Sequence, residues 1–169
     1  YFYRMRFREP GSAGFETRTE HSFRTQRPRG STFTFAIEAD PHMDENSDAA
    51  TYRLTLDNIL SAQPDFLVDL GDSFMSDKIQ NPTFAAVEQR AALLRSYYDT
   101  LGHSVPLFLA LGNHEGEWSS RVTSADSLPI WDTLIRKAYY PNPFANAFYS
   151  GQATPDPLAG LRESYFAWE

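Results

Sequence analysis

The sequence contains no cysteine, and none of its apolar runs approaches the ~20 residues that a membrane-spanning helix needs. The absence of cysteine excludes a disulfide framework, a thiolate metal site and a cysteine nucleophile. A phosphate-cradling glycine loop, a Gly-x-Ser-x-Gly elbow and a dinucleotide fingerprint are also missing. Any metal site in this chain must therefore use ligands other than thiolates.

The composition is that of a folded protein. Of the 169 residues, 41% are hydrophobic and 15% are aromatic, which allows a substantial core and argues against disorder. The length suits one full domain, or one domain with a piece of another. Because strand-like segments stand at both ends of the sequence, we expect the chain to be a fragment of a longer protein.

Charge divides the chain into two parts. Residues 1–30 hold seven arginines against three glutamates, a net charge of +4, whereas the rest holds eight lysines or arginines against nineteen acids, a net charge of −11. The Arg-Pro-Arg-Gly segment at residues 27–30 has the chemistry of a linker. We therefore predict two domains, at residues 1–30 and 31–169.

The first part has the pattern of a β-hairpin. In residues 1–8 apolar side chains alternate with arginines, which predicts a strand with one buried face. A turn at residues 10–14 and a second strand at residues 21–25 would complete the hairpin. Interleaved arginines and aromatic rings are also typical of a nucleic-acid surface. The acidic remainder of the chain opposes polyanion binding, so no nucleic-acid partner is expected.

The second part alternates strand-like and helix-like segments, which predicts an α/β fold with a parallel sheet. Apolar runs typical of buried strands occupy residues 33–39, 66–70 and 106–111. Segments with helical spacing lie near residues 51–62, 83–101 and 127–140. Residues 141–160 are rich in proline, asparagine and glycine and are predicted to be loop, before a last strand at residues 164–168.

A polar motif follows each of the three apolar runs directly. These motifs are Asp40-Pro41-His42, Gly71-Asp72 and Gly112-Asn113-His114-Glu115. In an open α/β sheet the functional crevice lies outside the carboxyl ends of the strands, so we expect the motifs to meet at one edge. Carboxylate, imidazole and amide groups are the ligands that a pair of divalent transition metals needs. The sequence therefore predicts a metal-dependent hydrolase.

The three motifs, in this order, resemble those of the calcineurin-like metallophosphoesterase superfamily. Their spacing leaves room for one strand–helix–strand unit of about 30 residues between successive motifs. The resemblance implies a partial metallophosphoesterase α/β sandwich that binds two divalent or trivalent ions, with Fe, Mn and Zn all suited to these ligands. The preceding hairpin resembles the end of a fibronectin type III-like module, which several extracellular members carry.

The resemblance also implies a role for each residue. Asp40 and His42 would hold the first metal, Asp72 would bridge both metals, and Asn113 would give its amide oxygen to the second. His114 would be the catalytic residue, either by bonding the phosphate or by donating a proton to the leaving oxygen.

Three acids are expected to support this site from behind. Glu115 would orient His114. Glu38 and Asp69 lie within apolar strands, and buried acids are uncommon unless they are paired.

Each motif has an ordinary alternative. Asp72 and Asn113 are suitable helix caps, Gly71 and Gly112 are suitable turn residues, and an isolated histidine such as His42 is more often a surface residue than a ligand. The order of the motifs, their placement after strands and their ligand types together favour the metal site.

Two departures from the family pattern limit the expected activity. Purple acid phosphatases carry a tyrosine three residues after the bridging aspartate, and that position is Met75 here, so no ferric tyrosinate is expected. The family completes its site with an isolated histidine and a Gly-His-x-His motif, whereas residues 116–169 contain no histidine. The chain itself is therefore expected to bind metal weakly and to hydrolyse little.

We predict from these features a phosphatase that hydrolyses a small-molecule phosphate ester at a dinuclear metal centre. A phosphodiesterase or nucleotidase of the same fold is an alternative, and so is a non-catalytic binding module that has lost the site. The resemblance of the first part to a fibronectin type III-like module implies a secreted or periplasmic location. The sequence does not specify an oligomeric state.

Overall fold

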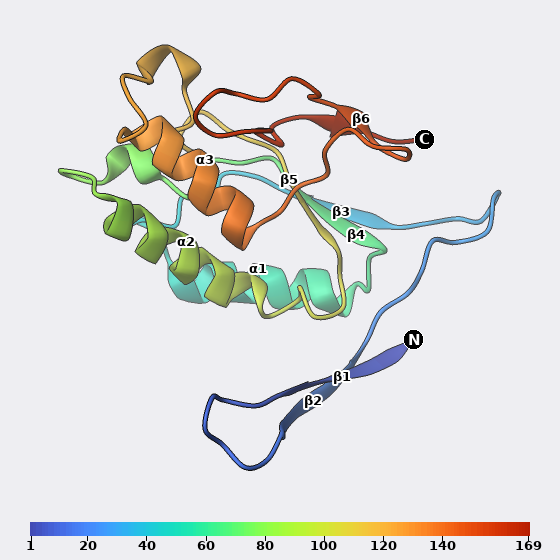
Figure 1. The fold of residues 1–169 in the computed structure, drawn as a ribbon. Coiled ribbons are helices and arrows are strands. Elements are labelled where there is room, and N and C mark those ends of the chain that lie inside the picture. The colour runs from blue at the N-terminus through green and yellow to red at the C-terminus, as the bar shows by residue number, and fades with distance from the viewer.

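The computed structural model describes residues 1–169, and its strands form three separate sheets (Figure 1). The elements, in chain order, are β1 (Phe2–Phe7), β2 (Glu16–Ser22), β3 (Phe35–Glu38), α1 (Ala49–Ser61), β4 (Phe66–Asp69), the 3-10 turn η1 (Ser76–Lys78), α2 (Phe84–Tyr98), β5 (Leu107–Leu109), the 3-10 turn η2 (Ser119–Arg121), α3 (Leu128–Tyr139), β6 (Ser150–Gly151) and β7 (Phe166–Ala167).

The central sheet is parallel, with the strand order β3–β4–β5. Its register places Glu38 beside Asp69, and Asp69 beside Leu109, so that the three strands end at the same edge. The α/β fold with a parallel sheet is therefore confirmed. Each strand is shorter than its apolar run, because the flanking residues already turn into the loops.

The core lies between this sheet and the helices. Leu67 of β4 and Leu109 of β5 are buried against Leu56 of α1 and Leu94 of α2. In Figure 1 α1 and α2 cover one face of the sheet, and the segment from residue 141 onward lies on the other side.

The helices begin at polar caps. The side chain of Asp48 accepts hydrogen bonds from the amides of Ala50 and Thr51, and that of Thr83 accepts one from Ala86. The predicted helix at 83–101 ends earlier, at Tyr98, since the amide of Gly102 donates back to the Tyr98 carbonyl and closes a turn. Because the caps of α1 and α2 are Asp48 and Thr83, Asp72 does not serve as a cap.

The second face of the sheet carries aromatic side chains. Trp168 stacks on Phe108 with ring centroids 4.8 Å apart, while Phe35 and Ile37 are exposed. The prediction of loop throughout residues 141–160 was wrong at β6, which pairs with β7. Two paired residues in a segment rich in proline and asparagine leave no periodic pattern to detect.

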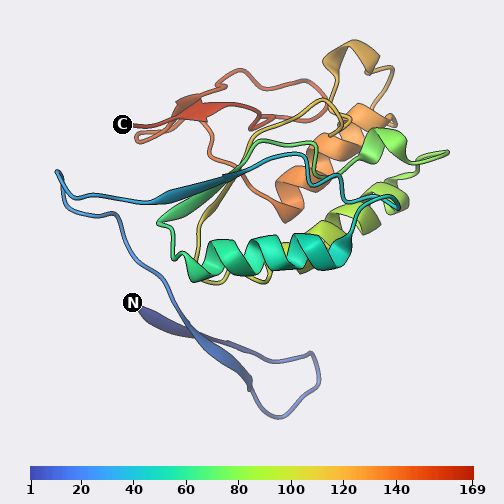
Figure 2. The ribbon, with the colours of Figure 1, turned by 180° about the vertical axis from the view of Figure 1, so that it is seen from behind.

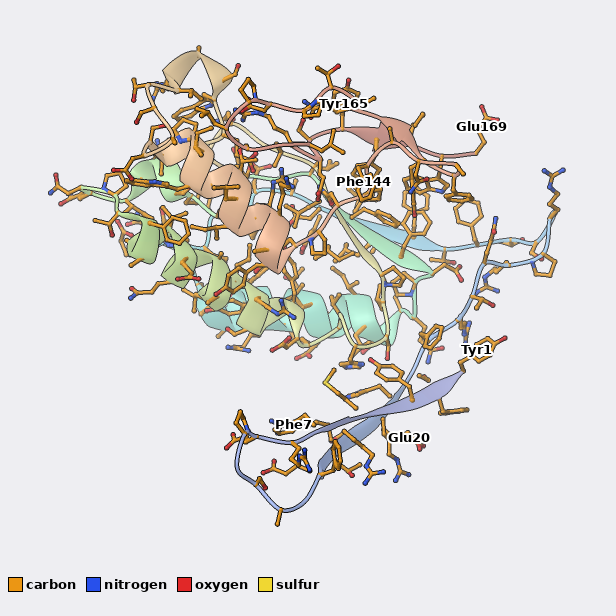
Figure 3. The ribbon with its side chains drawn as sticks, viewed as in Figure 1. Tyr1, Phe7, Glu20, Phe144, Tyr165 and Glu169 are labelled. Carbon is orange, nitrogen blue, oxygen red and sulfur yellow. The ribbon has the colours of Figure 1, made fainter.

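The hairpin of β1 and β2 extends away from the central sheet, beyond α1 (Figure 2), and most of its side chains, drawn in Figure 3, are exposed. The predicted second strand at residues 21–25 was wrong in position. It starts at Glu16, opposite Phe7, because pairing resumes as soon as the turn permits. The register shifts around Met5, whose side chain is exposed rather than buried.

Two contacts by Tyr3 and His21 tie the hairpin to the body. The Tyr3 hydroxyl donates to the carbonyl of His103, and the rings of His21 and His103 stack with centroids 4.1 Å apart. These two histidines therefore lie at the hairpin and not at the carboxyl edge of the sheet. None of the helices combines the length and apolarity needed to cross a membrane.

Candidate metal centre

The first two motifs lie on loops that continue the pairing of β3 with β4. The amide of Leu70 donates to Glu38 O at 2.9 Å, that of Asp40 to Gly71 O at 3.0 Å, and that of His42 to Asp72 O at 3.1 Å. These bonds hold the two loops side by side beyond the strand ends and bring the motifs together.

Asp40, His42 and Asp72 form a cluster of possible metal ligands. One ligand atom from each lies within 4.8 Å of the others. His42 Nε2 is 3.5 Å from Asp40 Oδ1 and 3.8 Å from Asp72 Oδ2. This nitrogen is buried and has no hydrogen-bond partner. An orphaned imidazole nitrogen between two carboxylates fits a metal ion of the Mn, Fe or Zn type.

The same three residues share an unusual backbone conformation. The φ angle is +57° at Asp40, +45° at His42 and +57° at Asp72. Residues other than glycine adopt this left-handed region rarely, at a cost of order 1–3 kcal/mol each, and they are enriched at functional sites. Four further residues of this chain adopt it outside the cluster, namely Gln63, Met75, Asn81 and Glu163. The backbone of the loops is therefore strained at the three residues whose side chains form the cluster.

The third motif is attached to the second through Asp72. The amide of His114 donates to Asp72 Oδ1 at 2.7 Å. The buried Glu115 carboxylate accepts from the amides of Asp72 at 3.0 Å and Ser73 at 2.7 Å, and also from that of Gly112. Burial raises the pKa of Glu115, and these amide donors oppose the shift. Glu115 thus joins the β4 and β5 loops into one unit.

Asn113 is exposed and lies between two residues that approach Asp72. A Cβ added to Gly112 would stand 2.3 Å from Asp72 Oδ1, and the His114 amide donates to that same oxygen. The two neighbours of Asn113 in the chain therefore both contact the Asp72 carboxylate, while Asn113 itself is exposed.

The partner of the His114 ring is Asp77 rather than Glu115. His114 Nδ1 lies 2.9 Å from Asp77 Oδ2, and its ring centroid is 5.8 Å from that of His42. Glu115 was expected to orient this ring, but its carboxylate faces backbone amides instead. Asp77 belongs to η1 and to none of the sequence motifs, so no local pattern pointed to it.

Asp69 and Glu38 lie beneath the loops without bonding to the side chains of the cluster. Asp69 accepts from the amide of Gly71 at 2.7 Å and from the hydroxyls of Ser73 and Tyr98. Burial raises the pKa of Asp69. Burial, with the charge of Asp69 added, raises the pKa of Glu38 to about 7. Asp69 therefore supports the Gly71 turn, behind the cluster.

A further buried acid, Asp132 of α3, lies behind the third motif and was not anticipated from the sequence. It is 5% exposed. Burial raises the pKa of Asp132 to about 8; the nearby Ser76 hydroxyl opposes the shift, and the charges of Glu117, Glu115 and Asp77 add to it. A raised pKa means that the folded protein holds this proton more tightly than the unfolded chain does. Stability should therefore fall as the pH rises from about 4 toward about 8.

Replacing Asp132 with asparagine, which imitates the protonated carboxyl, should reduce the fall in the free energy of unfolding between pH 5 and pH 8. Urea unfolding at pH 5 and pH 8, with chelator present, would measure it. The exposed Asp57→Asn on α1 is the matched control and should keep the wild-type slope. Equal slopes in all three proteins would show that Asp132 does not titrate in this range.

Comparison with known proteins agrees with this geometry. Residues 33–165 match the family model of the calcineurin-like phosphoesterases. Searches of curated proteins and of solved structures gave no match. The family match covers most of the chain and spans all three motifs. Members of the family hydrolyse phosphoesters with the aid of metal ions, and this chain belongs to the calcineurin-like phosphoesterase family.

Proposed function

We propose that this chain forms the metal-binding half of a dinuclear site that hydrolyses small phosphate monoesters. The observation that carries the proposal is the cluster of Asp40, His42 and Asp72 with its unpartnered imidazole nitrogen. In this arrangement Asp40 and His42 would hold one ion, Asp72 would be shared between two, and Asn113 would contribute its amide oxygen to the second. A metal pair of this kind supplies a strong nucleophile from water at neutral pH and stabilises charge on the phosphoryl oxygens.

The protein's own groups set the geometry for that chemistry. The His114 amide fixes Asp72 Oδ1, which leaves Oδ2 facing His42. Asp77 engages His114 Nδ1, so the proton on that nitrogen is held by the carboxylate and Nε2 remains for the substrate. In its charged form His114 would give the Nε2 proton to the leaving oxygen.

Metal binding tests the proposal directly. Calorimetric titration of the chelator-treated protein with Mn²⁺ should show binding that His42→Ala weakens at least about tenfold, because one ligand is lost. His103 is half-buried against His21 and far from the cluster, so His103→Ala should leave the affinity unchanged. Equal binding in all three proteins would place the metal elsewhere.

Substrate class is tested with two chromogenic esters. Hydrolysis of p-nitrophenyl phosphate in Mn²⁺ should exceed that of bis-p-nitrophenyl phosphate, since a monoester offers more oxygens to a metal pair. Residues 116–169 contain no histidine, so we expect slow turnover by the chain itself. Preference for the diester would favour a phosphodiesterase.

We further propose that residues 1–30 are part of a separate fibronectin type III-like module and that the protein acts outside the cytoplasm. The hairpin's separation from the body supports the first of these proposals (Figure 2). The second rests on the analogy with extracellular relatives that carry such a module.

A further inference from the structure

A small cavity lies behind the third motif, between α2, α3 and the loops that follow β4 and β5. Its volume is about 10 Å³, close to the space that one water molecule requires. Its polar lining consists of Ser76, Arg90, Glu115, Glu117, Asp132 and Arg136.

Asp132 lies next to two segments of the site, one containing Ser76 and the other containing Gly116. Its Oδ2 is buried and has no hydrogen-bond partner. A Cβ added to Gly116, where φ is +80°, would lie 2.1 Å from this oxygen and 2.8 Å from Ser76 Oγ. The Ser76 hydroxyl in turn donates to the Glu115 carbonyl at 2.7 Å. Asp132 therefore faces both the segment before Asp77 and the segment after His114.

The neighbouring arginines do not donate hydrogen bonds to Asp132 Oδ2. Arg136 donates to Glu117 at 2.5 Å and 3.2 Å and to the carbonyl of Arg162. Arg90 donates to the Met43 carbonyl at 3.0 Å. A buried carboxyl oxygen without a partner is unfavourable, so a water-sized cavity with polar walls beside it indicates a bridging water.

We propose that Asp132, through one buried water, positions the Ser76–Asp77 segment against the His114–Gly116 segment and so maintains the pairing of His114 with Asp77. Asp132 is then a positioning residue for the hydrolysis proposed above, and this inference rests on that proposed function. A protonated carboxyl suits the role, because it can donate to the water while the water donates onward. The charged groups that face it are Asp77, Glu115 and Glu117 from the loops, Arg90 from α2 and Arg136 from α3.

The tautomer of His114 reports this role without requiring turnover. Nitrogen-15 spectra of the imidazoles, recorded in chelator near pH 7.5 and assigned with His114→Ala, give the ratio of the Nδ1–H form to the Nε2–H form. We expect Asp132→Ala to lower this ratio for His114 by about threefold or more, because the Asp77 contact loosens. Asp132→Asn should preserve the ratio, and the exposed Asp57→Asn is the matched control.

A purely structural role would give a different result. Asp132→Ala would then lower the melting temperature and leave the His114 ratio unchanged, which would overturn the proposal. An equal fall of the His114 ratio in Asp132→Asn and Asp132→Ala would overturn the proposal as well. If Asp132→Ala does not fold, Ser76→Ala takes its place, with the same expected fall in the ratio.

Asp77→Ala removes the acceptor that faces His114 Nδ1, and so it separates this inference from the function on which it rests. It must lower the His114 ratio, and an unchanged ratio would refute the pairing itself and the role of Asp132 with it. A fall in Asp77→Ala but not in Asp132→Ala would refute the role of Asp132 alone. Failure of Mn²⁺ to bind would refute the proposed function while the ratios still test the positioning role.

Discussion

Replacing Asp72 with asparagine is expected to abolish metal binding at the cluster and phosphoester hydrolysis together. One Asp72 oxygen accepts the His114 amide at 2.7 Å, and the other lies 3.8 Å from His42 Nε2. Asparagine can keep the first contact but loses the negative charge that two cations would share. Affinity for Mn²⁺ should fall by at least about a hundredfold, because a shared ligand affects both ions. Calorimetric titration measures the affinity, and hydrolysis of p-nitrophenyl phosphate measures the activity.

Two controls separate this effect from a loss of folding. Asp57→Asn removes one negative charge from the exposed side of α1 and should bind metal as the wild type does. Thermal unfolding of Asp72→Asn in chelator should remain cooperative, since the backbone bonds of its loop persist. Hydrolysis at the wild-type rate would rule out Asp72 as the bridging ligand.

Replacing Gly71 with alanine should produce the largest loss of stability. The φ angle at Gly71 is +91°, and an added Cβ would stand 2.1 Å from Gly112 N and 2.9 Å from Ala110 O. Both neighbours are backbone atoms, which cannot rotate away as a side chain can. Left-handed strain and forced displacement of the β5 loop together should lower the free energy of unfolding by about 3 kcal/mol or more, as urea denaturation would measure.

Gly14→Ala is the matched substitution for this experiment. Gly14 lies in the turn of the hairpin, with no atom within 4 Å of an added Cβ and no positive φ. Its replacement should change the free energy of unfolding by less than about 0.5 kcal/mol. If Gly71→Ala were equally mild, the close approach of the β4 and β5 loops would not exist in solution.

The parallel sheet was predictable because its strands carry their own signals. Leu67 and Leu109 lie in continuous apolar runs, as strands covered by helices require. The meeting of Asp40, His42 and Asp72 follows from the rule that parallel strands end at a common edge. Motifs that follow successive parallel strands can therefore be predicted to lie close together in space.

The support beneath the site was not predictable in the same way. Asp77 belongs to the 3-10 turn η1, and its contact with His114 depends on how that turn packs against the β5 loop. Asp132 belongs to α3, which lies far from both motifs in the sequence. Glu115 follows His114 directly, yet its carboxylate turns to the amides of the β4 loop. Such contacts depend on side-chain direction in irregular loops, for which sequence periodicity carries no information.

The attachment of the hairpin has a mechanical consequence. Its two contacts through Tyr3 and His21 and its covalent linker all reach the body at the amino-terminal side of the sheet, whereas the cluster lies beyond the carboxyl ends. A displacement of the hairpin would therefore act first on the linker and on the His21–His103 stack, which lie away from Asp40. The cluster and the attachment of the hairpin therefore lie at opposite ends of the central sheet.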